Sequence, residues 1–140
     1  MSLVIDASVA VKWFVPEPGH DSARALLDLN DALIAPDWLL AEVANVFWKQ
    51  QRRGQINLSL AQEALNILPG LLDLRPTAAL VNEALKIAHS IDHPVYDCIY
   101  LALTREQGAT LVTDDRGLIR KGVASDFSVI ALENSSRDLK

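Results

Sequence analysis

Short apolar runs alternate with longer stretches of helical periodicity along the whole chain. The apolar runs predict five strands, at residues 3–5, 32–36, 72–76, 109–113 and 128–132. Apolar positions three or four residues apart predict the intervening helices, at 7–14, 20–29, 37–53, 57–68, 77–91, 94–107 and 114–123. Asp37 and Thr77 are expected to cap the helices that follow them. The polar segment 133–140 is expected to be a frayed tail.

The alternation of strands with helices indicates the fold class. The strands are apolar along most of their length, which is typical of a parallel sheet covered on both faces. The sequence therefore predicts a three-layer α/β/α sandwich with a five-stranded, mainly parallel sheet and right-handed crossovers. No linker or repeat divides the chain, so residues 1–140 are expected to form one domain. Sites in such folds form at the carboxyl ends of the strands.

Composition and charge exclude several classes of protein. Half of the 140 residues are hydrophobic, which is a globular composition. No apolar run reaches the roughly 18 residues that span a bilayer, and no secretory signal is visible, so no membrane association is expected. The single cysteine, Cys98, excludes an internal disulfide and is compatible with a reducing cytoplasm. A net charge of −5 argues against binding nucleic acid by bulk positive charge, but it is compatible with holding phosphates through metal ions.

Acidic residues stand at the ends of two predicted strands. Asp6 directly follows the first strand, and Asp114 and Asp115 follow the fourth. Helix capping is the ordinary role of an aspartate at such a junction. Ser8 and Thr113 place hydroxyl groups beside these acids, where they are suited either to capping or to orienting a ligand.

Two further acids interrupt apolar helices. Glu42 lies in LLAEVANVFW, with Asn45 on the same helix face and no basic residue one turn away to pair with it. Asp97 opens the apolar helix HPVYDCIYLAL just after Pro94. An exposed helix face explains Glu42 equally well, and the helix dipole alone favours an aspartate at Asp97.

These acids make sense together if their segments meet at one edge of the sheet. Converging carboxylates repel one another unless a hard divalent cation lies among them, and Mg²⁺ and Mn²⁺ prefer such oxygen ligands. No zinc-like set of histidines and cysteines is present, so surface or capping roles are expected for His20, His89 and His93. Neither a glycine-rich phosphate loop nor a nucleophile elbow is present.

Four segments, in this order, resemble the PIN domain family: DASVAVKWFVPEP, LLAEVANVFW, VYDCIYLALT and LVTDD. The likeness is greatest to the VapC-type toxins of toxin–antitoxin pairs and extends from residue 3 to about residue 132. It implies a Mg²⁺- or Mn²⁺-dependent endoribonuclease in which water attacks the phosphodiester, leaving a 5′-phosphate and a 3′-hydroxyl. It also implies a sheet of order 3-2-1-4-5, a homodimer and a cognate antitoxin.

The resemblance assigns roles to individual residues. The acids of the family, which are both metal ligands and catalytic residues, fall on Asp6, Glu42, Asp97 and Asp115. The Thr-x-Asp pattern of the family is met by Thr113, Asp114 and Asp115, with Asp114 in the variable position. Ser8 and Asn45 match common supporting positions.

The basic and aromatic residues give further expectations. RNA contacts, as an alternative to ordinary solvated surface, are expected among Arg52, Arg53, Arg116, Arg120 and Lys121. An antitoxin is expected to insert an arginine among the acids and to use apolar surface near Trp13, Trp38 or Trp48.

Two other functions fit the same residues. One is a non-catalytic RNA- or protein-binding module that holds a structural cation. The other is a metal-dependent phosphatase, which usually has a nucleophilic aspartate two residues before a second one. Ser8 stands at that second position here, which argues against the phosphatase.

Overall fold

The computed structural model describes residues 1–139, whose strands form one sheet in the order β3-β2-β1-β4-β5. All four strand pairings are parallel. The strands are β1 (Ser2–Ile5), β2 (Ala32–Pro36), β3 (Asp73–Arg75), β4 (Thr110–Thr113) and β5 (Val129–Ala131). The predicted strands and the strand order implied by the resemblance are confirmed, and the sheet is fully parallel.

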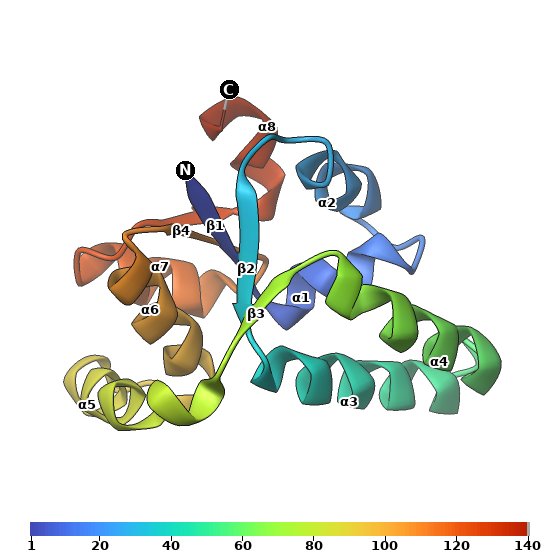
Figure 1. Ribbon diagram of the computed structural model, residues 1–140, viewed down its shortest axis with the longest axis horizontal. Helices are drawn as coiled ribbons and strands as arrows, with labels where there is room; N and C mark the ends of the chain where they lie inside the picture. Colours follow the sequence, from blue (N-terminus) through green and yellow to red (C-terminus); the bar gives the residue numbers. More distant parts are fainter. Residues whose placement is uncertain (140) are drawn as a thin grey trace.

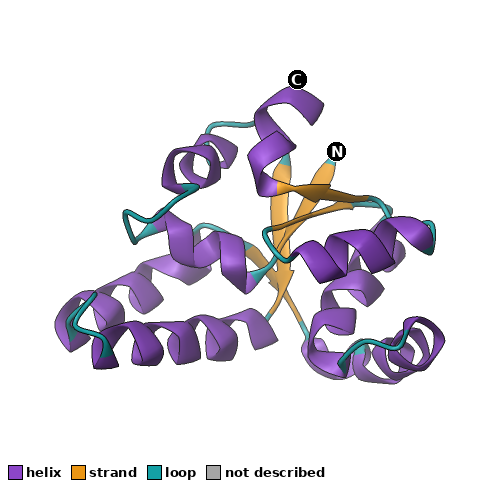
Figure 2. Ribbon diagram, turned by 180° about the vertical axis from the view of Figure 1, so that it is seen from behind, coloured by secondary structure: helices purple, strands orange, loops and turns teal. Residues whose placement is uncertain are grey.

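Helices cover both faces of this sheet (Figures 1 and 2). One side carries α1 (Ala7–Ala10), the 3₁₀ helix η1 (Val11–Trp13), α2 (His20–Leu26), α3 (Trp38–Arg52) and α4 (Leu58–Ile67), followed by η2 (Leu68–Gly70). The other side carries η3 (Thr77–Ala79), α5 (Val81–Ile91), α6 (Val95–Gln107) and α7 (Arg116–Ala124). The chain moves outward from central β1 to β3 and then returns to β4 and β5, so right-handed crossovers place the two groups on opposite faces.

The core lies around the central strands. Leu3, Val4 and Ile5 of β1 are fully buried, and α6 packs against β1, β2 and β4 with its residues 98–104 buried. At the sheet edge, α7 approaches β5 closely because Gly122 has no side chain. A Cβ atom at Gly122 would lie 2.8 Å from Cγ2 of Val129. No helix within residues 1–139 has both the length and the apolar character needed to span a membrane.

The expectation that Asp37 and Thr77 cap the helices that follow them was wrong. Each side chain instead accepts a hydrogen bond from the backbone of the segment that contains the other residue. Trp38 N–H, at the start of α3, donates to Thr77 Oγ1 at 2.8 Å. Thr77 Oγ1 and N–H in turn donate to Asp37 Oδ1 at 2.6 and 3.1 Å, and these bonds lower the pKa of Asp37. The exchange ties the start of α3 to the segment after β3, and α3 carries Glu42.

The segment expected to be a frayed tail contains helical turns over part of residues 133–139, while residue 140 lies outside the described part of the chain. After β5 the chain forms η4 (Leu132–Asn134) and α8 (Ser135–Asp138). Helix α8 contacts α2 and β5, and buried Ser135 donates from Oγ to the Leu132 carbonyl at 2.7 Å. The side chain of Leu132 is buried in the core and anchors this turn. The mostly polar sequence of residues 133–140 gave no indication of this contact.

Candidate metal centre

Asp6 follows the central strand β1 and receives hydrogen bonds on both carboxylate oxygens. Ser8 donates to Oδ1 from its Oγ at 2.5 Å and from its backbone N–H at 2.9 Å. Thr113 Oγ1, from the end of neighbouring β4, donates to Oδ2. Asp6 is therefore the N-cap of α1 and also the link between two strand ends, so the capping role and the site role coexist.

Burial makes the charge of Asp6 costly. The carboxylate is enclosed, and this desolvation raises the pKa of Asp6 from 3.8 to about 6. Hydrogen bonds from Ser8 and Thr113 oppose the shift, while the charge of Asp97 adds to it. A cation beside Asp6 would reverse the balance.

Glu42 projects from α3 toward the same region. Tyr100 Oη, on α6, donates to Glu42 Oε1 at 2.6 Å. Desolvation, with smaller contributions from the charges of Asp6 and Asp97, raises the pKa of Glu42 from 4.5 to about 7, although the Tyr100 hydrogen bond opposes the shift. Burial and the neighbouring acids also raise the pKa of Tyr100 well above its usual value, so Tyr100 keeps its proton and remains a donor to Glu42.

Asp97, in the first turn of α6, is the third acid of this region. One ligand atom each from His93, Asp97 and Asp115 lie within 4.8 Å of one another, an arrangement suited to holding an ion. Asp115 accepts a hydrogen bond from Leu118 N–H at 3.1 Å and so caps α7. Of the four predicted acids, Asp97 and Asp115 thus lie in one close group, and the charge of Asp97 also acts on the other two, Asp6 and Glu42.

His93 is the residue of this cluster that the sequence did not indicate. Its Nε2 lies 2.7 Å from Asp97 Oδ2, and its side chain is 10% exposed. Asp92, in the left-handed conformation at φ 54°, ends α5 and directs the chain back, and His93 N–H donates to the Ala88 carbonyl at 3.2 Å. Lys121 Nζ, on α7, donates to the Asp92 carbonyl, so this turn is also tied to the helix that Asp115 caps.

The four predicted supporting residues have different surroundings. Ser8 and Thr113 both contact Asp6, as described above. Asp114 donates from its N–H to Ser8 Oγ at 3.1 Å, while its carboxylate lies 3.5 Å from Lys12 Nζ. Asn45 is exposed one turn after Glu42, and its role stays a prediction.

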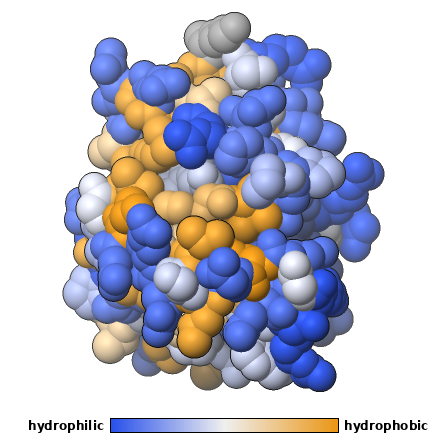
Figure 3. Space-filling view, turned by 90° about the vertical axis from the view of Figure 1, so that its right-hand side faces the viewer, coloured by the Kyte–Doolittle hydropathy of each residue, from blue (hydrophilic) through white to orange (hydrophobic). Residues whose placement is uncertain are grey.

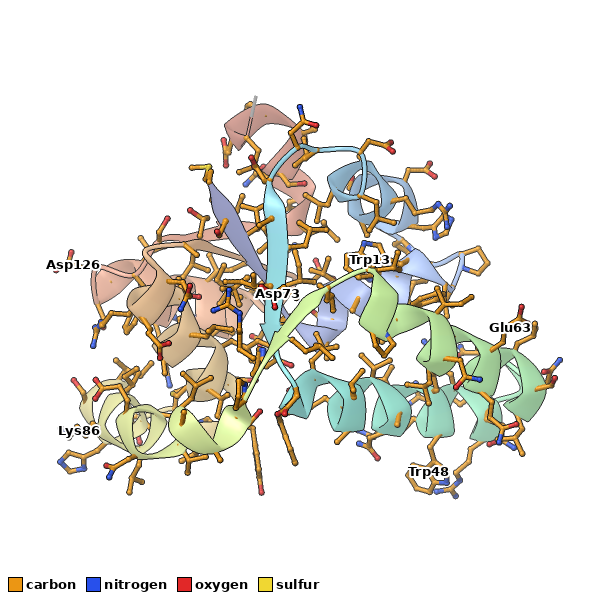
Figure 4. All side chains as sticks on the ribbon, in the orientation of Figure 1. Trp13, Trp48, Glu63, Asp73, Lys86 and Asp126 are labelled. Atoms are coloured by element: carbon orange, nitrogen blue, oxygen red, sulfur yellow. The ribbon has the colours of Figure 1, made fainter. Side chains whose placement is uncertain are left out.

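The basic residues expected to contact RNA also differ. Lys121 is engaged with the Asp92 carbonyl, and the Arg52 guanidinium lies over the Trp48 ring at 5.0 Å. Trp48 is exposed and projects from the outer face of α3 (Figure 4). Arg53, Arg116 and Arg120 are exposed.

The donor set fits a hard divalent cation. Within residues 1–139, no lysine or arginine forms an ion pair with Asp6, Glu42, Asp97 or Asp115. Two of these acids have raised pKa values because burial leaves their charge uncompensated. Carboxylate oxygens match the preferences of Mg²⁺ and Mn²⁺.

Comparison with known proteins places this arrangement in a family. The family model of the PIN domain matches residues 3–124. The chain is 34% identical over 127 residues to Ribonuclease VapC3 of Pyrobaculum aerophilum, covering 86% of this chain and 95% of that protein.

Two solved structures share the fold at low sequence identity. VapC20 of Mycobacterium tuberculosis, described as a sarcin–ricin loop cleaving toxin, has a TM-score of 0.70 and 19% identity, over 90% of this chain and 96% of that one. VapBC2 of Rickettsia felis, bound to a DNA fragment from its promoter, has a TM-score of 0.63 and 16% identity, over 94% and 98%. With the family model covering most of its length, the chain belongs to the PIN domain family.

Proposed function

We propose that this protein is a metal-dependent endoribonuclease and the toxin of a type II toxin–antitoxin pair. The observation that carries the proposal is the gathering of Asp6, Glu42 and Asp115 around Asp97, at the carboxyl edge of the sheet. Its similarity to Ribonuclease VapC3 supports RNA as the substrate.

In this proposal the four acids hold one or two Mg²⁺ or Mn²⁺ ions. A bound ion of this kind activates water and neutralises charge on a phosphate. Asp6 is fixed by Ser8 and Thr113, and Glu42 by Tyr100, so their carboxylates are oriented before substrate arrives.

The proposal is tested by offering the purified protein two substrates side by side, a cellular RNA mixture and p-nitrophenyl phosphate. Each is incubated with Mg²⁺, with Mn²⁺ and with EDTA. We expect cleavage of RNA only with a metal ion, leaving 5′-phosphate ends, and no release of p-nitrophenol. Metal binding without cleavage would indicate a binding module, and hydrolysis of p-nitrophenyl phosphate alone would indicate a phosphatase.

We further propose an antitoxin partner, supported by the VapBC2 likeness. Apolar side chains gather on the α4 side of the molecule (Figure 3), where a cavity of about 310 Å³ is lined by Phe14, Val15, Ile56, Leu60 and Ile67. Trp13 is not part of any such surface, because it is 1% exposed and donates from Nε1 to the Ala23 carbonyl at 2.8 Å. A cytoplasmic location and a homodimer also belong to this proposal, on the basis of the family resemblance.

Co-expression tests the partner. We expect a small protein encoded beside this chain to co-purify with it and to suppress its RNA cleavage. Leu60→Asp, in the cavity beside α4, should release that protein, because a buried charge without a partner is costly. Leu85→Asp, an equally exposed leucine on α5, is the matched control. Retention of the protein by the Leu60 variant would move the interface elsewhere.

His93 gives a prediction about ion affinity. Its Nε2 bonds to Oδ2 of Asp97, which would orient this carboxylate toward a bound ion. We expect His93→Leu to weaken Mn²⁺ binding roughly 10–100-fold, as losses of groups that orient metal ligands usually do. His93→Gln keeps an N–H donor and should retain part of the affinity. Calorimetric Mn²⁺ titration checks this, and equal affinities for both variants and the wild type would contradict it.

A further inference from the structure

Helix α3 carries more than Glu42 on the face that meets the candidate metal centre. Val46, Lys49, Gln50 and Arg53 follow Glu42 at spacings of three and four residues, so they share its side of the helix. At a rise of about 1.5 Å per residue, Lys49 lies about 10 Å and Arg53 about 16 Å along the axis from Glu42. An acidic end and a basic end thus follow one another along a single face.

A cavity of about 370 Å³ lies along this face. Its lining includes Ser8, Lys12, Glu17, Lys49, Gln50 and Arg53. Ser8 also bonds to Asp6, so the cavity and the candidate metal centre share this residue.

The charges in the cavity do not cancel. Glu17 is its only lining acid, and both of its oxygens are engaged, Oε1 with Lys12 Nζ at 3.2 Å and Oε2 with Gln50 Nε2 at 3.4 Å. Lys12 also lies 3.5 Å from Asp114. Within residues 1–139, neither Lys49 nor Arg53 forms an ion pair. Two cations are therefore available to an anion, in a protein whose net charge is −5.

We propose that this cavity is a subsite for the RNA backbone, in which Lys49 and Arg53 bind phosphates on one side of the cleaved bond. The inference rests on the proposed function, because it takes the acids at the far end as the place of cleavage. A polyanion is the occupant that the charges favour. Spacing along α3 then sets a directional track, from the phosphate at the metal centre to those at the basic end.

The test is RNA binding in EDTA, where hydrolysis plays no part. Fluorescence anisotropy with a fluorescein-labelled single-stranded 12-mer of uridine is measured at several salt concentrations. Each phosphate contact to a single strand contributes about 0.7 to the slope of log affinity against log salt. We expect Lys49→Ala/Arg53→Ala to make that negative slope shallower by about 1.4 and to weaken RNA binding several-fold at low salt.

Lys86→Ala/Arg137→Ala is the matched control, since it removes the same charge from exposed positions outside this cavity. It should keep the wild-type slope. An unchanged slope in the Lys49/Arg53 variant, or an equal fall in the control, would overturn the subsite. If the Lys49/Arg53 variant bound RNA like the wild type but no longer bound a polyglutamate peptide, the cavity would be assigned to an acidic protein segment instead. Failure of the proposed function appears separately, as absence of metal-dependent RNA cleavage by the wild type.

Discussion

Replacing Asp97 by asparagine is expected to abolish RNA cleavage while leaving the fold intact. The change keeps the size of the side chain but removes the charge at the centre of the acidic cluster. Because groups that merely orient metal ligands are worth roughly 10–100-fold, loss of a central ligand should cost more than about 100-fold in kcat. Initial rates on RNA with saturating Mn²⁺ measure the loss, and circular dichroism checks the fold.

Asp126→Asn is the matched control for this prediction. Asp126 is exposed in the turn after α7, at the edge of the molecule (Figure 4). Its positive φ of 67° suits asparagine, so the substitution introduces no strain. The control should cleave at the wild-type rate. Full activity of the Asp97 variant would remove Asp97 from the catalytic set.

Without metal ions, the protein is expected to lose stability as pH rises from about 4 to about 7. The folded-state pKa of Asp6 is raised from 3.8 to about 6, so between these values the folded protein holds a proton that the unfolded chain releases. Stability falls with pH wherever the folded state binds more protons. For Asp6 the full loss above pH 6 is roughly 3 kcal/mol, and the raised pKa of Glu42 extends the window to about 7.

This loss should appear in thermal melting. For a chain of this size, roughly 3 kcal/mol corresponds to a Tm change of about 10 °C. Asp6→Asn should flatten the pH dependence in EDTA and melt higher than wild type at neutral pH, because asparagine caps a helix about as well as aspartate. Saturating Mn²⁺ should stabilise the wild type more than the variant, since an ion that binds only the folded state shifts the equilibrium.

Melting curves between pH 4.5 and 8, in EDTA and in Mn²⁺, make the comparison. Asp126→Asn again controls for the loss of one carboxylate. A wild type whose Tm rises with pH in EDTA, or an Asp6 variant with the same slope as wild type, would mean that the buried acids are not strained without an ion.

The strands of the sheet could be predicted from the sequence because they are short apolar runs, and polar residues follow several of them. Asp6 and Asp115 could be placed at one edge because parallel strands expose their carboxyl ends together. Glu42 and Asp97 were recognisable as charges in apolar helices. What joins these acids, the hydrogen bonds of Ser8 and Thr113 to Asp6 and of Tyr100 to Glu42, depends on side-chain directions that periodicity does not determine.

His93 shows why part of the site was missed. A lone histidine before a proline carries no spacing signal, and its direction depends on the left-handed turn at Asp92. The exchange of partners between Asp37 and Thr77 was hidden for a similar reason, since it joins residues 40 positions apart. The sequence alone suggested that Trp13 could contact a partner, but η1 directs its side chain into the core.

The hydrogen bond between Asp6 and Thr113 spans 107 residues, because β4 takes its place beside β1 only after β2 and β3 have been laid down. Contacts so distant along the chain form late, once the intervening segments have closed. On the ribosome, the first of the acids emerges long before the partners that complete its site. A growing chain that has not yet released β4 and α7 lacks Asp115 and the Thr113 hydroxyl, so it lacks part of the cluster proposed to cut RNA. Translation itself thus postpones the activity until β4 and α7 have been made.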